Sequence, residues 1–594
     1  MLSKNSYSKA VIKDNLRRLW SLSAVCLMIF VMGLMLPMIY NYRQFNYVAT
    51  SAAELMKGGS FMMNFSLVLL AVLASVEAFD YMHRQVSSNT MHSLPLNRTR
   101  LFNSAFISGW LMIVVPIVVF AVMLMSLRGA TSINAGPAAT DFYDMFGTEA
   151  MSAKEIFTLP HMFEFIITSV VVATVVYAIA CLAGVLSGQK GIHGLLAYFL
   201  FFAPVGLVLL LDTTCGRFLV GYDGLNFDYT YLNVCAYAMA KEGFGLEAGM
   251  LLYYIAIAVI LTVASLLIYK RVKLERVGNS TTFPAVGDTL ATILAAVLTI
   301  TFTHTSTLFA FDSSMNDATR FALTSIIAST VMYAAMRMIA DSSYKIFNKR
   351  NFIQYGIFLA VLAVIMAFTV FDITGYERRV PNADEIKSVS CRTVFQQAIP
   401  QIDNNEDRRS DNPALIKDVL NLHEAIVNDE SILNELNNIW SEDYDMTSSC
   451  DVTIVWELEN GREMKRKYDV KCNGSDSEKA LRRLYDNKAF KERFREDLNT
   501  IFANARTIKL SDMGSEELIE IRKDDWKDIQ AALTQDIMSR TFDQTVQIGD
   551  EAGNYIDIET AERAIIGNKF YTLWICEEYD KNIYKVLKEK GYKK

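Results

Sequence analysis

The first 372 residues of this chain contain few charged residues. Only 44 of them are Asp, Glu, Lys or Arg, about 12%, whereas a soluble globular domain carries about 25%. The remaining 222 residues contain 77 charged side chains and a net charge of −11. This division excludes a single soluble globule, a fibrous repeat and a disordered chain. The total of −7 excludes a nucleic-acid-binding protein that relies on overall basicity.

The chain also lacks the motifs of common catalytic sites. The GxxxxGK[ST] loop that cradles nucleotide phosphates is absent, and so are the HExxH and GxSxG motifs. Only six histidines occur and they are scattered, which argues against a multi-histidine metal centre. We therefore expect no enzymatic activity in this chain and no cofactor or metal bound by it.

Long apolar runs are abundant in the first part of the chain. A transmembrane helix needs about 20 consecutive, mostly apolar residues. The sequence therefore predicts a polytopic α-helical membrane protein with about nine transmembrane helices. The nine runs are Trp20–Tyr40, Phe61–Phe79, Ala105–Leu127, Met162–Leu186, Gly194–Leu211, Met250–Tyr269, Leu290–Phe311, Phe321–Ala340 and Ile353–Phe371.

Basic residues in the connecting segments predict the orientation of these helices. If the N-terminus is cytoplasmic, the segments on that side hold 16 Lys and Arg residues and the opposite loops hold 7. An odd number of spans then places residues 373–594 outside the cell, as an extracytoplasmic domain. Its alternating and helical patterns predict an α+β fold, and its acidic surface either attracts cationic peptides or serves only to keep the domain soluble.

The segment before the first span has an amphipathic pattern. Val11, Ile12, Leu16 and Leu19 recur at helical spacing, and basic residues lie between them. This pattern predicts a helix on the inner leaflet, with its cations near anionic headgroups of membrane lipids. The alternative is an ordinary basic flank of a transmembrane helix.

The loop between the second and third spans, Phe79–Asn103, is short, polar and basic. Asp80 and Arg84 have the i,i+4 spacing of a helical ion pair. Pro95 ends any helix and holds the preceding residue extended. The loop also carries an apolar ridge that suits docking into a groove of a cytoplasmic partner. The ridge consists of Met91, Leu94 and Leu96.

The order of these parts resembles type-2 ABC transporter permeases, the ABC-2 exporter family. The resemblance covers roughly residues 1–270, and its motif is Ser93-Leu94-Pro95-Leu96-Asn97-Arg98-Thr99-Arg100-Leu101-Phe102 between the second and third spans. It implies an amphipathic connector helix in residues 1–19 and a six-span permease core in residues 20–270. It also implies that the loop docks into a separate ABC ATPase subunit, which binds ATP and Mg, and that a second permease chain completes the transporter.

The resemblance implies that Arg98 and Arg100 pair with acidic groups of the ATPase, while Pro95 fixes the shape of the loop. We expect coupling to the ATPase to involve a set of residues in and next to this loop. They are His83, Arg84, Ser87, Met91, Ser93, Leu94, Pro95, Arg98, Arg100, Leu101 and Phe102.

The chain departs from the common family layout in two ways: three additional transmembrane helices occupy residues 271–372, and the domain of residues 373–594 follows them. This layout resembles a Gram-positive subset of permeases with a C-terminal extracytoplasmic domain, which implies a bacterial plasma membrane. We expect a permease subunit that exports an antimicrobial peptide, a drug or a lipid-linked precursor. The alternative is a membrane-anchored sensor or binding protein whose outer domain recognises an extracellular ligand.

Two ionisable residues lie inside predicted spans. His304 is surrounded by threonines in the seventh span, and Arg337 lies in the eighth. Ionisable residues at membrane depth commonly mark transport pathways, so we interpret the two as a candidate polar transport seam. The alternative is snorkelling of these side chains to the membrane surface.

Cys450 and Cys472 bracket a predicted β-hairpin around Asn460-Gly461. A register symmetric about Gly461 places the two cysteines opposite each other, and an extracytoplasmic location permits a disulfide between them. In a reducing host the thiols stay free. The other expected strands are Glu385–Val394, Thr507–Leu510, Thr545–Ile548, Tyr555–Ile558 and Phe570–Ile575, and the expected helices are Pro413–Asn428, Ser477–Ile501, Ser515–Ser539 and Asp580–Lys590.

Overall fold

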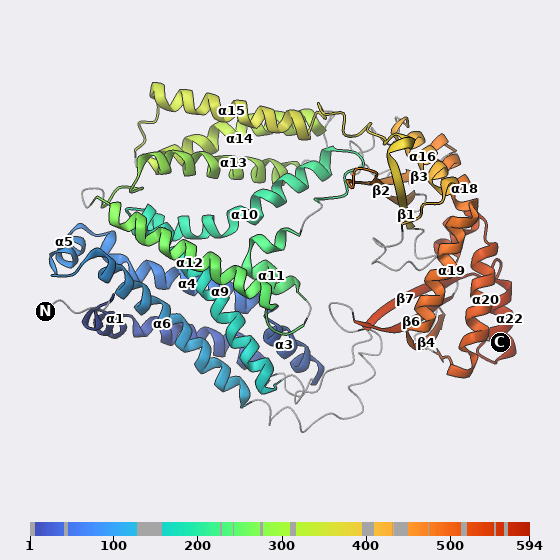
Figure 1. Ribbon diagram of the computed structural model, residues 1–594, viewed down its shortest axis with the longest axis horizontal. Coiled ribbons are helices and arrows are strands. Elements are labelled where there is room, and N and C mark those ends of the chain that lie inside the picture. Colours follow the sequence, from blue (N-terminus) through green and yellow to red (C-terminus); the bar gives the residue numbers. More distant parts are fainter. Residues whose placement is uncertain are drawn as a thin grey trace.

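The computed structural model is mostly helical, with a sheet-containing C-terminal region (Figure 1). In the part of the chain that the structure describes, nine helices are long and apolar enough to cross a membrane, which confirms the predicted number. The described residues are 6–40, 45–126, 157–225, 228–241, 243–273, 277–308, 317–341, 343–394, 409–429, 432, 449–472, 474–512, 519–551, 554–563 and 568–593.

The long helices coincide with the apolar runs because a helix satisfies all of its backbone polar groups internally, as a hydrocarbon environment requires. Most of them extend past the apolar run at one or both ends. Their bounds are α1 Lys9–Phe30, which continues through a π-helical turn Val31–Met35 into α2 Leu36–Tyr40, then α4 Phe61–Ala78, α6 Arg98–Met125, α9 Leu159–Leu186, α10 Lys190–Phe218, α12 Ala248–Arg271, α13 Pro284–Leu308, α14 Asp317–Ala340 and α15 Lys349–Thr369. Shorter helices are α3 Phe45–Lys57, α5 Gln85–Ser93 and α11 Val234–Ala240.

The first helix differs from the expectation of a separate connector in residues 1–19. Helix α1 begins at Lys9 and runs on into the apolar segment, so that one stretch of 32 residues reaches Tyr40. Asn15 explains part of this continuity, because its Nδ2 donates a hydrogen bond of 3.0 Å to Ser108 Oγ of α6 in the interior. A helix of this length measures about 48 Å, whereas the hydrocarbon core is about 30 Å thick.

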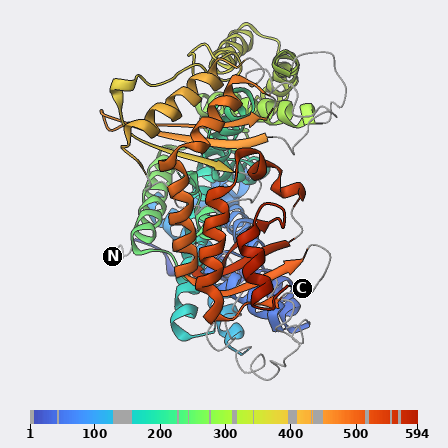
Figure 2. The same cartoon turned by 90° about the vertical axis from the view of Figure 1, so that its right-hand side faces the viewer.

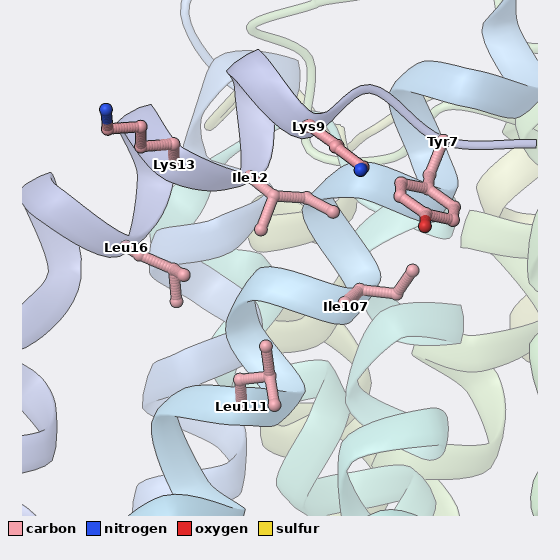
Figure 3. Close-up of a pocket in the computed structure, with 7 residues that line it drawn as sticks. All are labelled: Tyr7, Lys9, Ile12, Lys13, Leu16, Ile107 and Leu111. Atoms are coloured by element: carbon pink, nitrogen blue, oxygen red, sulfur yellow. The ribbon is translucent and has the colours of Figure 1, made fainter. Parts of the chain in front are cut away.

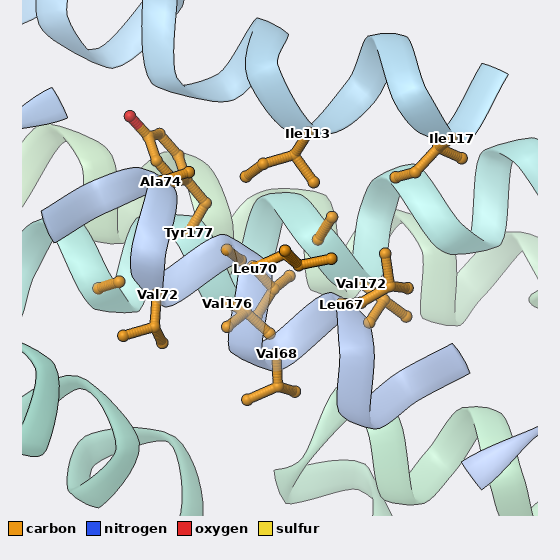
Figure 4. Packing of buried hydrophobic residues seen from close by; sticks show 14 of the residues in the cluster. Leu67, Val68, Leu70, Val72, Ala74, Ile113, Ile117, Val172, Val176 and Tyr177 are labelled. Atoms are coloured by element: carbon orange, nitrogen blue, oxygen red, sulfur yellow. The ribbon is translucent and has the colours of Figure 1, made fainter. Parts of the chain in front are cut away.

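The helices before residue 272 share one apolar core, in which α4 and α9 are the most buried. Figure 4 shows Leu67 and Leu70 of α4 between Ile113 of α6 and Val172 of α9. Small side chains of α4 and α9 allow the two backbones to approach closely, as is common between membrane helices. Helices α13, α14 and α15 form a separate group with small clusters of their own (Figure 1).

The described parts of the C-terminal region, residues 373–593, contain two antiparallel sheets. The first has the order β1-β2-β3 and the second β5-β4-β6-β7. The helices of this region lie on its far side from the membrane-spanning helices (Figures 1 and 2). The strands are β1 Ile386–Val394, β2 Ser449–Leu458, β3 Glu463–Lys471, β4 Ala505–Asp512, β5 Ile519–Glu520, β6 Asn554–Arg563 and β7 Asn568–Ile575, and the helices are α16 Pro413–Val427, α18 Asp476–Asp486, α19 Lys488–Ala503, α20 Trp526–Ser539, α21 Phe542–Glu551 and α22 Lys581–Glu589.

The same succession of elements occurs twice in this region. The first module, residues 386–486, has the order β1, α16, β2, β3, α18, and the second, residues 505–589, has the order β4, α20, β6, β7, α22. In both modules the middle strand pairs antiparallel with its two neighbours, and the two helices pack against each other. The second module adds β5 and α21. The expected α+β region is therefore a tandem pair of similar modules.

Four sequence expectations for this region are wrong in detail. The helix expected over Ser515–Ser539 begins only at Trp526, after strand β5 and a 3₁₀ turn at Lys523–Asp525. Residues 545–548 belong to helix α21 instead of a strand, and the helix expected over Ser477–Ile501 is two helices. The break lies at Asn487, whose Oδ1 accepts a hydrogen bond from Ala489 N and so caps α19. The hairpin is confirmed, but its register is centred on Asn460 because Trp456 pairs with Met464.

The first module is attached to the end of α10. Gly221 forms an antiparallel bridge with Lys467 of β3, and Val220 belongs to the apolar core of the C-terminal region. Gly221 has a φ of 78°, and a Cβ on it would lie 2.6 Å from the ring of Tyr468, so only glycine fits there. Lys465 Nζ lies 3.1 Å from Asp223 Oδ2 and adds an ion pair to this attachment.

Candidate functional site

The loop between the second and third spans folds into two short helical pieces. A 3₁₀ turn at Asp80–Met82 is followed by helix α5. Helix α5 ends at Ser93 because Leu94 is extended, with φ −65° and ψ 145°, before Pro95. The predicted effect of Pro95 on the preceding residue is thus confirmed. The loop leads directly into α6, which begins at Arg98.

A cluster of ion pairs joins this loop to the first residue of α10. Lys190 Nζ lies 2.6 Å from Glu77 Oε1 and 3.5 Å from Asp80 Oδ1. Arg84 Nε lies 3.3 Å from the same oxygen of Asp80, so the predicted i,i+4 pair is present. These side chains are partly exposed, and such pairs contribute only about 0–1 kcal/mol each. Their main effect is to hold the loop against α10.

A buried pair of imidazoles lies beneath the ion pairs. His193 Nε2 lies 2.8 Å from the carbonyl oxygen of Ala180, so Nε2 carries the proton and Nδ1 accepts. The acceptor Nδ1 is 3.0 Å from His83 Nε2, which therefore donates. Burial lowers the pKa of His83 to about 4, so that its ring is neutral near pH 7. This chain of donors joins the loop to both α10 and α9.

A second chain of hydrogen bonds connects the loop to α12. Tyr81 donates to the hydroxyl of Tyr269 at 3.2 Å, and Tyr269 donates to His92 Nε2 at 3.1 Å. His92 Nδ1 in turn donates to the carbonyl oxygen of Ser88, 2.8 Å away. Because Tyr269 lies in the last turns of α12, both ends of the loop are fixed to this helix.

Arg98 is directed into the protein. Its Nη1 donates to the carbonyl oxygens of Tyr269, Lys270 and Val272 at 3.3, 3.0 and 2.8 Å. The last carbonyls of a helix have no partner within the helix and carry partial negative charge, which a guanidinium group satisfies well. Sequence reasoning assigned Arg98 to pairing with an ATPase and missed this contact.

The other residues of the motif divide between the interior and the surface. Leu101 and Phe102 are buried, and Arg100 is half-buried. Among the expected ridge residues only Leu94 is exposed, at 39%, while Met91 and Leu96 are half-buried. Ser93 and Pro95 are exposed as well, and Ser87 is half-buried.

Sequence reasoning missed the most exposed apolar side chain of the loop, Val86, which is 81% exposed. The side chain of Arg84 is 63% exposed beside it. The helical spacing of Val86, Thr90 and Ser93 was the available signal, because all three lie on the exposed side of α5. The outward surface of the loop therefore combines one cation with Val86 and Leu94.

His304 and Arg337 lie in different environments and do not contact each other. His304 Nε2 is 2.9 Å from Thr214 Oγ1 of α10. Arg337 is fully buried, and its guanidinium contacts Asp288 of α13 at 2.7 Å and Asp341 at 2.9 Å. Buried hydroxyl groups lie between α13 and α14, and Ser325 Oγ donates to Thr303 Oγ1 at 3.3 Å. The structure thus shows a polar strip in this helix group, and a role in transport stays a prediction.

Cys450 pairs with Val470 across the hairpin instead of with Cys472, and both cysteines are free thiols. The expected register was displaced because the turn has three residues, with Gly461 last at a φ of 75° and a hydrogen bond of 2.9 Å from Leu458 N to the carbonyl of Arg462. The described residues hold no group of three or more His, Cys, Asp or Glu that could bind a metal ion.

A lateral groove of about 500 Å³ lies between α6, α9 and α12. Its wall is apolar and aromatic, with Phe106 and Trp110 from α6 and Tyr254 from α12. Trp110 Nε1 donates to Thr174 Oγ1 of α9 at 2.9 Å. Two of these three helices, α6 and α12, are directly connected to the loop of the candidate site.

Comparisons with known protein families, with curated proteins and with solved structures found no match to this chain.

Proposed function

We propose that this chain is the membrane-spanning permease subunit of an ATP-driven ABC exporter in a bacterial plasma membrane. The observation that carries the proposal is the short helix α5. Residues in α5 and next to it are hydrogen-bonded to α10 and α12, His193 of α10 is hydrogen-bonded in turn to α9, and the segment leads into α6. A surface element connected to four membrane-spanning helices suits the input of mechanical work from a soluble partner. In this proposal the N-terminus is cytoplasmic and the C-terminal region lies outside.

The contacts of the loop define how such work reaches the membrane. A displacement of α5 acts on α6 through residues 94–97, a connection of four residues that is too short to absorb much movement. It acts on α10 through Lys190 and His193. ATP and Mg bind to a separate ATPase subunit, and closure of two such subunits moves two copies of the loop, one from each permease chain. Export of a hydrophobic or amphipathic substrate follows from the rearrangement of these helices.

The lateral groove between α6, α9 and α12 is the candidate contact for the substrate. Its aromatic wall and its volume of about 500 Å³ suit part of an amphipathic molecule that enters from the lipid phase. Both α6 and α12 are connected to the loop, so the same displacement changes the shape of the groove. An antimicrobial peptide, a drug and a lipid-linked precursor are the substrate classes that this chemistry accommodates.

The test is recovery of an ATPase with the tagged chain, purified from its native host in mild detergent. We expect the wild-type chain to retain an ABC ATPase and the variant Val86→Asp to lose most of it, because a carboxylate would replace the exposed apolar contact. The matched control is Phe347→Asp, since Phe347 is equally exposed, at 81%, on a loop of the same predicted side. Absence of an ATPase from the wild-type preparation, or equal retention by the Val86→Asp chain, contradicts the proposal.

The attachment of the first module to α10 favours one alternative, a membrane-anchored sensor whose outer region recognises a ligand. In that case the chain transports nothing, and the loop signals to a different cytoplasmic partner. Reconstituted vesicles distinguish the two functions. ATP-dependent movement of a labelled amphipathic peptide supports the exporter, whereas a ligand-dependent change without movement supports the sensor.

A further inference from the structure

A groove of about 490 Å³ lies between the first turns of α1 and helix α6 (Figure 3). Its walls are the apolar side chains of Ile12 and Leu16 from α1 and of Ile107 and Leu111 from α6. All four are half-buried, so they flank an open channel instead of filling one another's space. The groove therefore offers an open, apolar surface.

The α1 side of the groove is cationic. Lys9 and Lys13 line it one helical turn apart, and both are exposed. Neither lysine forms a hydrogen bond or ion pair with any residue in the described parts of the chain. The side chain of Tyr7 lies next to Lys9, and Lys13 lies on the other side of Ile12 (Figure 3). Two ammonium groups and a hydroxyl at the mouth of an apolar groove are complementary to an anionic amphiphile.

The depth of the groove in a membrane follows from the lengths and contacts of the two helices. The backbone N–H of Ser8 donates to Ser104 Oγ at 2.8 Å, so the start of α1 is level with residue 104, one turn before Ile107. Because the helix from Lys9 to Tyr40 is longer than the hydrocarbon core is thick, its first turns reach the headgroup region. Ile12 and Ile107 therefore lie level with the two lysines, at the boundary of the headgroup region, and Leu16 and Leu111 lie deeper, toward the acyl chains.

We propose that this groove binds one anionic phospholipid of the leaflet that contains the N-terminal ends of α1 and α6. The acyl chain lies against Ile107 and Leu111, and the headgroup phosphate lies between Lys9 and Lys13. The hydroxyl of Tyr7 donates a further hydrogen bond to a phosphate oxygen. A zwitterionic lipid fits less well, because its own cation opposes the two ammonium groups. This inference goes beyond the proposed function and does not depend on it.

Native mass spectrometry of the full chain in detergent tests the proposal, with phosphatidylglycerol and phosphatidylcholine as the two probes. We expect the wild-type chain to retain one phosphatidylglycerol in preference to phosphatidylcholine. A lysine near an anionic lipid surface contributes about a fivefold change in affinity, so Lys9→Ala/Lys13→Ala weakens phosphatidylglycerol binding about 25-fold. The same variant leaves phosphatidylcholine binding nearly unchanged.

Two further variants sharpen the test. Leu111→Trp fills the apolar part of the groove and should weaken the binding of both lipids. Lys345→Ala/Lys349→Ala is the matched control, because these lysines have the same spacing but lie outside the groove. Equal retention of the two lipids by the wild-type chain overturns the proposal. It is also overturned if Lys345→Ala/Lys349→Ala weakens phosphatidylglycerol binding as much as Lys9→Ala/Lys13→Ala does. Conversion of a dimer to a monomer by Leu111→Trp, with lipid binding unchanged, also overturns it, since the occupant is then a second copy of the chain.

Discussion

The Nε2 atom of His83 lies 3.0 Å from Nδ1 of His193, so the loop before α5 is hydrogen-bonded to the first turn of α10 in the protein interior. Both rings are buried, and the backbone carbonyl of Ala180 fixes the direction of the donors. Removal of either imidazole leaves a buried polar partner unsatisfied, which typically costs about 1–3 kcal/mol. This contact makes the interior of the protein sensitive to small changes around His193.

Gly184 provides the space for His193. A Cβ at this position would lie 2.6 Å from His193 Cε1, and both Gly184 and His193 are buried in the closely packed interior. We expect Gly184→Ala to lower the free energy of unfolding by about 1–3 kcal/mol, as overpacking does, and to lower the thermal unfolding temperature in detergent. The control is Gly206→Ala in α10, where nothing lies within 4 Å of the new Cβ. An unchanged unfolding temperature for Gly184→Ala would refute the packing argument.

Arg98 should stabilise the fold more than Arg84 does. Arg98→Ala removes the donor for three carbonyls at the end of α12, and we expect a loss of about 1–2 kcal/mol. The stability of Arg98→Lys should lie between those of the wild type and Arg98→Ala, because one ammonium group cannot span the three acceptors as a guanidinium does. Arg84→Ala should change stability by less than about 1 kcal/mol, since its pair with Asp80 is at the surface. Thermal unfolding of the three purified variants measures the order, and a larger effect of Arg84→Ala contradicts it.

Arg540 and Asp580 form a buried ion pair in the second module. Arg540 Nη2 lies 2.6 Å from Asp580 Oδ2, and the side chains are 1% and 0% exposed. Arg540→Met leaves the carboxylate buried without its cation, so we expect a loss of about 3–5 kcal/mol. The control Lys585→Ala breaks an exposed pair of 3.9 Å with Glu589 and should cost less than about 0.5 kcal/mol. Unfolding of the full chain in urea, followed by limited proteolysis, gives an unfolding midpoint for each variant. Similar midpoints for Arg540→Met and Lys585→Ala would disprove the expectation.

His423 should make the first module sensitive to acid. The indole N–H of Trp456 can only donate, so His423 Nδ1 accepts at 3.2 Å and its Nε2 donates to Tyr468 Oη at 2.9 Å. Burial and the positive charge of Arg466 lower the pKa of His423 to about 4. Between pH 6.5 and 4 the unfolded chain therefore binds more protons than the folded chain, and stability falls as the pH falls.

The expected loss between pH 7 and pH 5 is about 2 kcal/mol. Thermal unfolding of the full chain at the two pH values measures it through tryptophan fluorescence. His423→Gln keeps a polar group at the site but does not titrate, so this contribution to the pH dependence should disappear. An identical pH dependence in wild-type and variant chains would show that His423 is not responsible.

The positions of the membrane-spanning helices could be predicted because an apolar run is a local property. The ends of these helices could not be predicted, because the helices continue into polar residues whose hydrogen-bonding groups are satisfied by neighbouring helices. Helix α10 begins at Lys190, four residues before the predicted start, and ends at Phe218, seven residues after the predicted end. The error at residues 545–548 has a different cause. Phe542, Thr545 and Ile548 are buried at three-residue spacing, and so short a stretch fits a strand or a helix.

The candidate site shows the same division between local and distant causes. The extended residue before Pro95 follows from one proline, and the pair of Asp80 and Arg84 follows from their spacing. The direction of Arg98 depends on carbonyls more than 170 residues later in the chain, and nothing in the loop indicates them. The exposure of Val86 likewise depends on which side of α5 faces the bundle.

Helix α10 has consequences for communication across the protein. Its first turn holds Lys190 and His193 against the loop, and the residues that follow its last turn are built into the first module. The helix of 29 residues spans about 43 Å between these two attachments. If a partner bound at the loop changes the position of the first module through α10, the coupling must also act in the opposite direction. A ligand of that module then changes the affinity of the chain for the partner by the same free energy. In the proposed orientation, α10 would thereby report a ligand bound outside the cell to the cytoplasmic side.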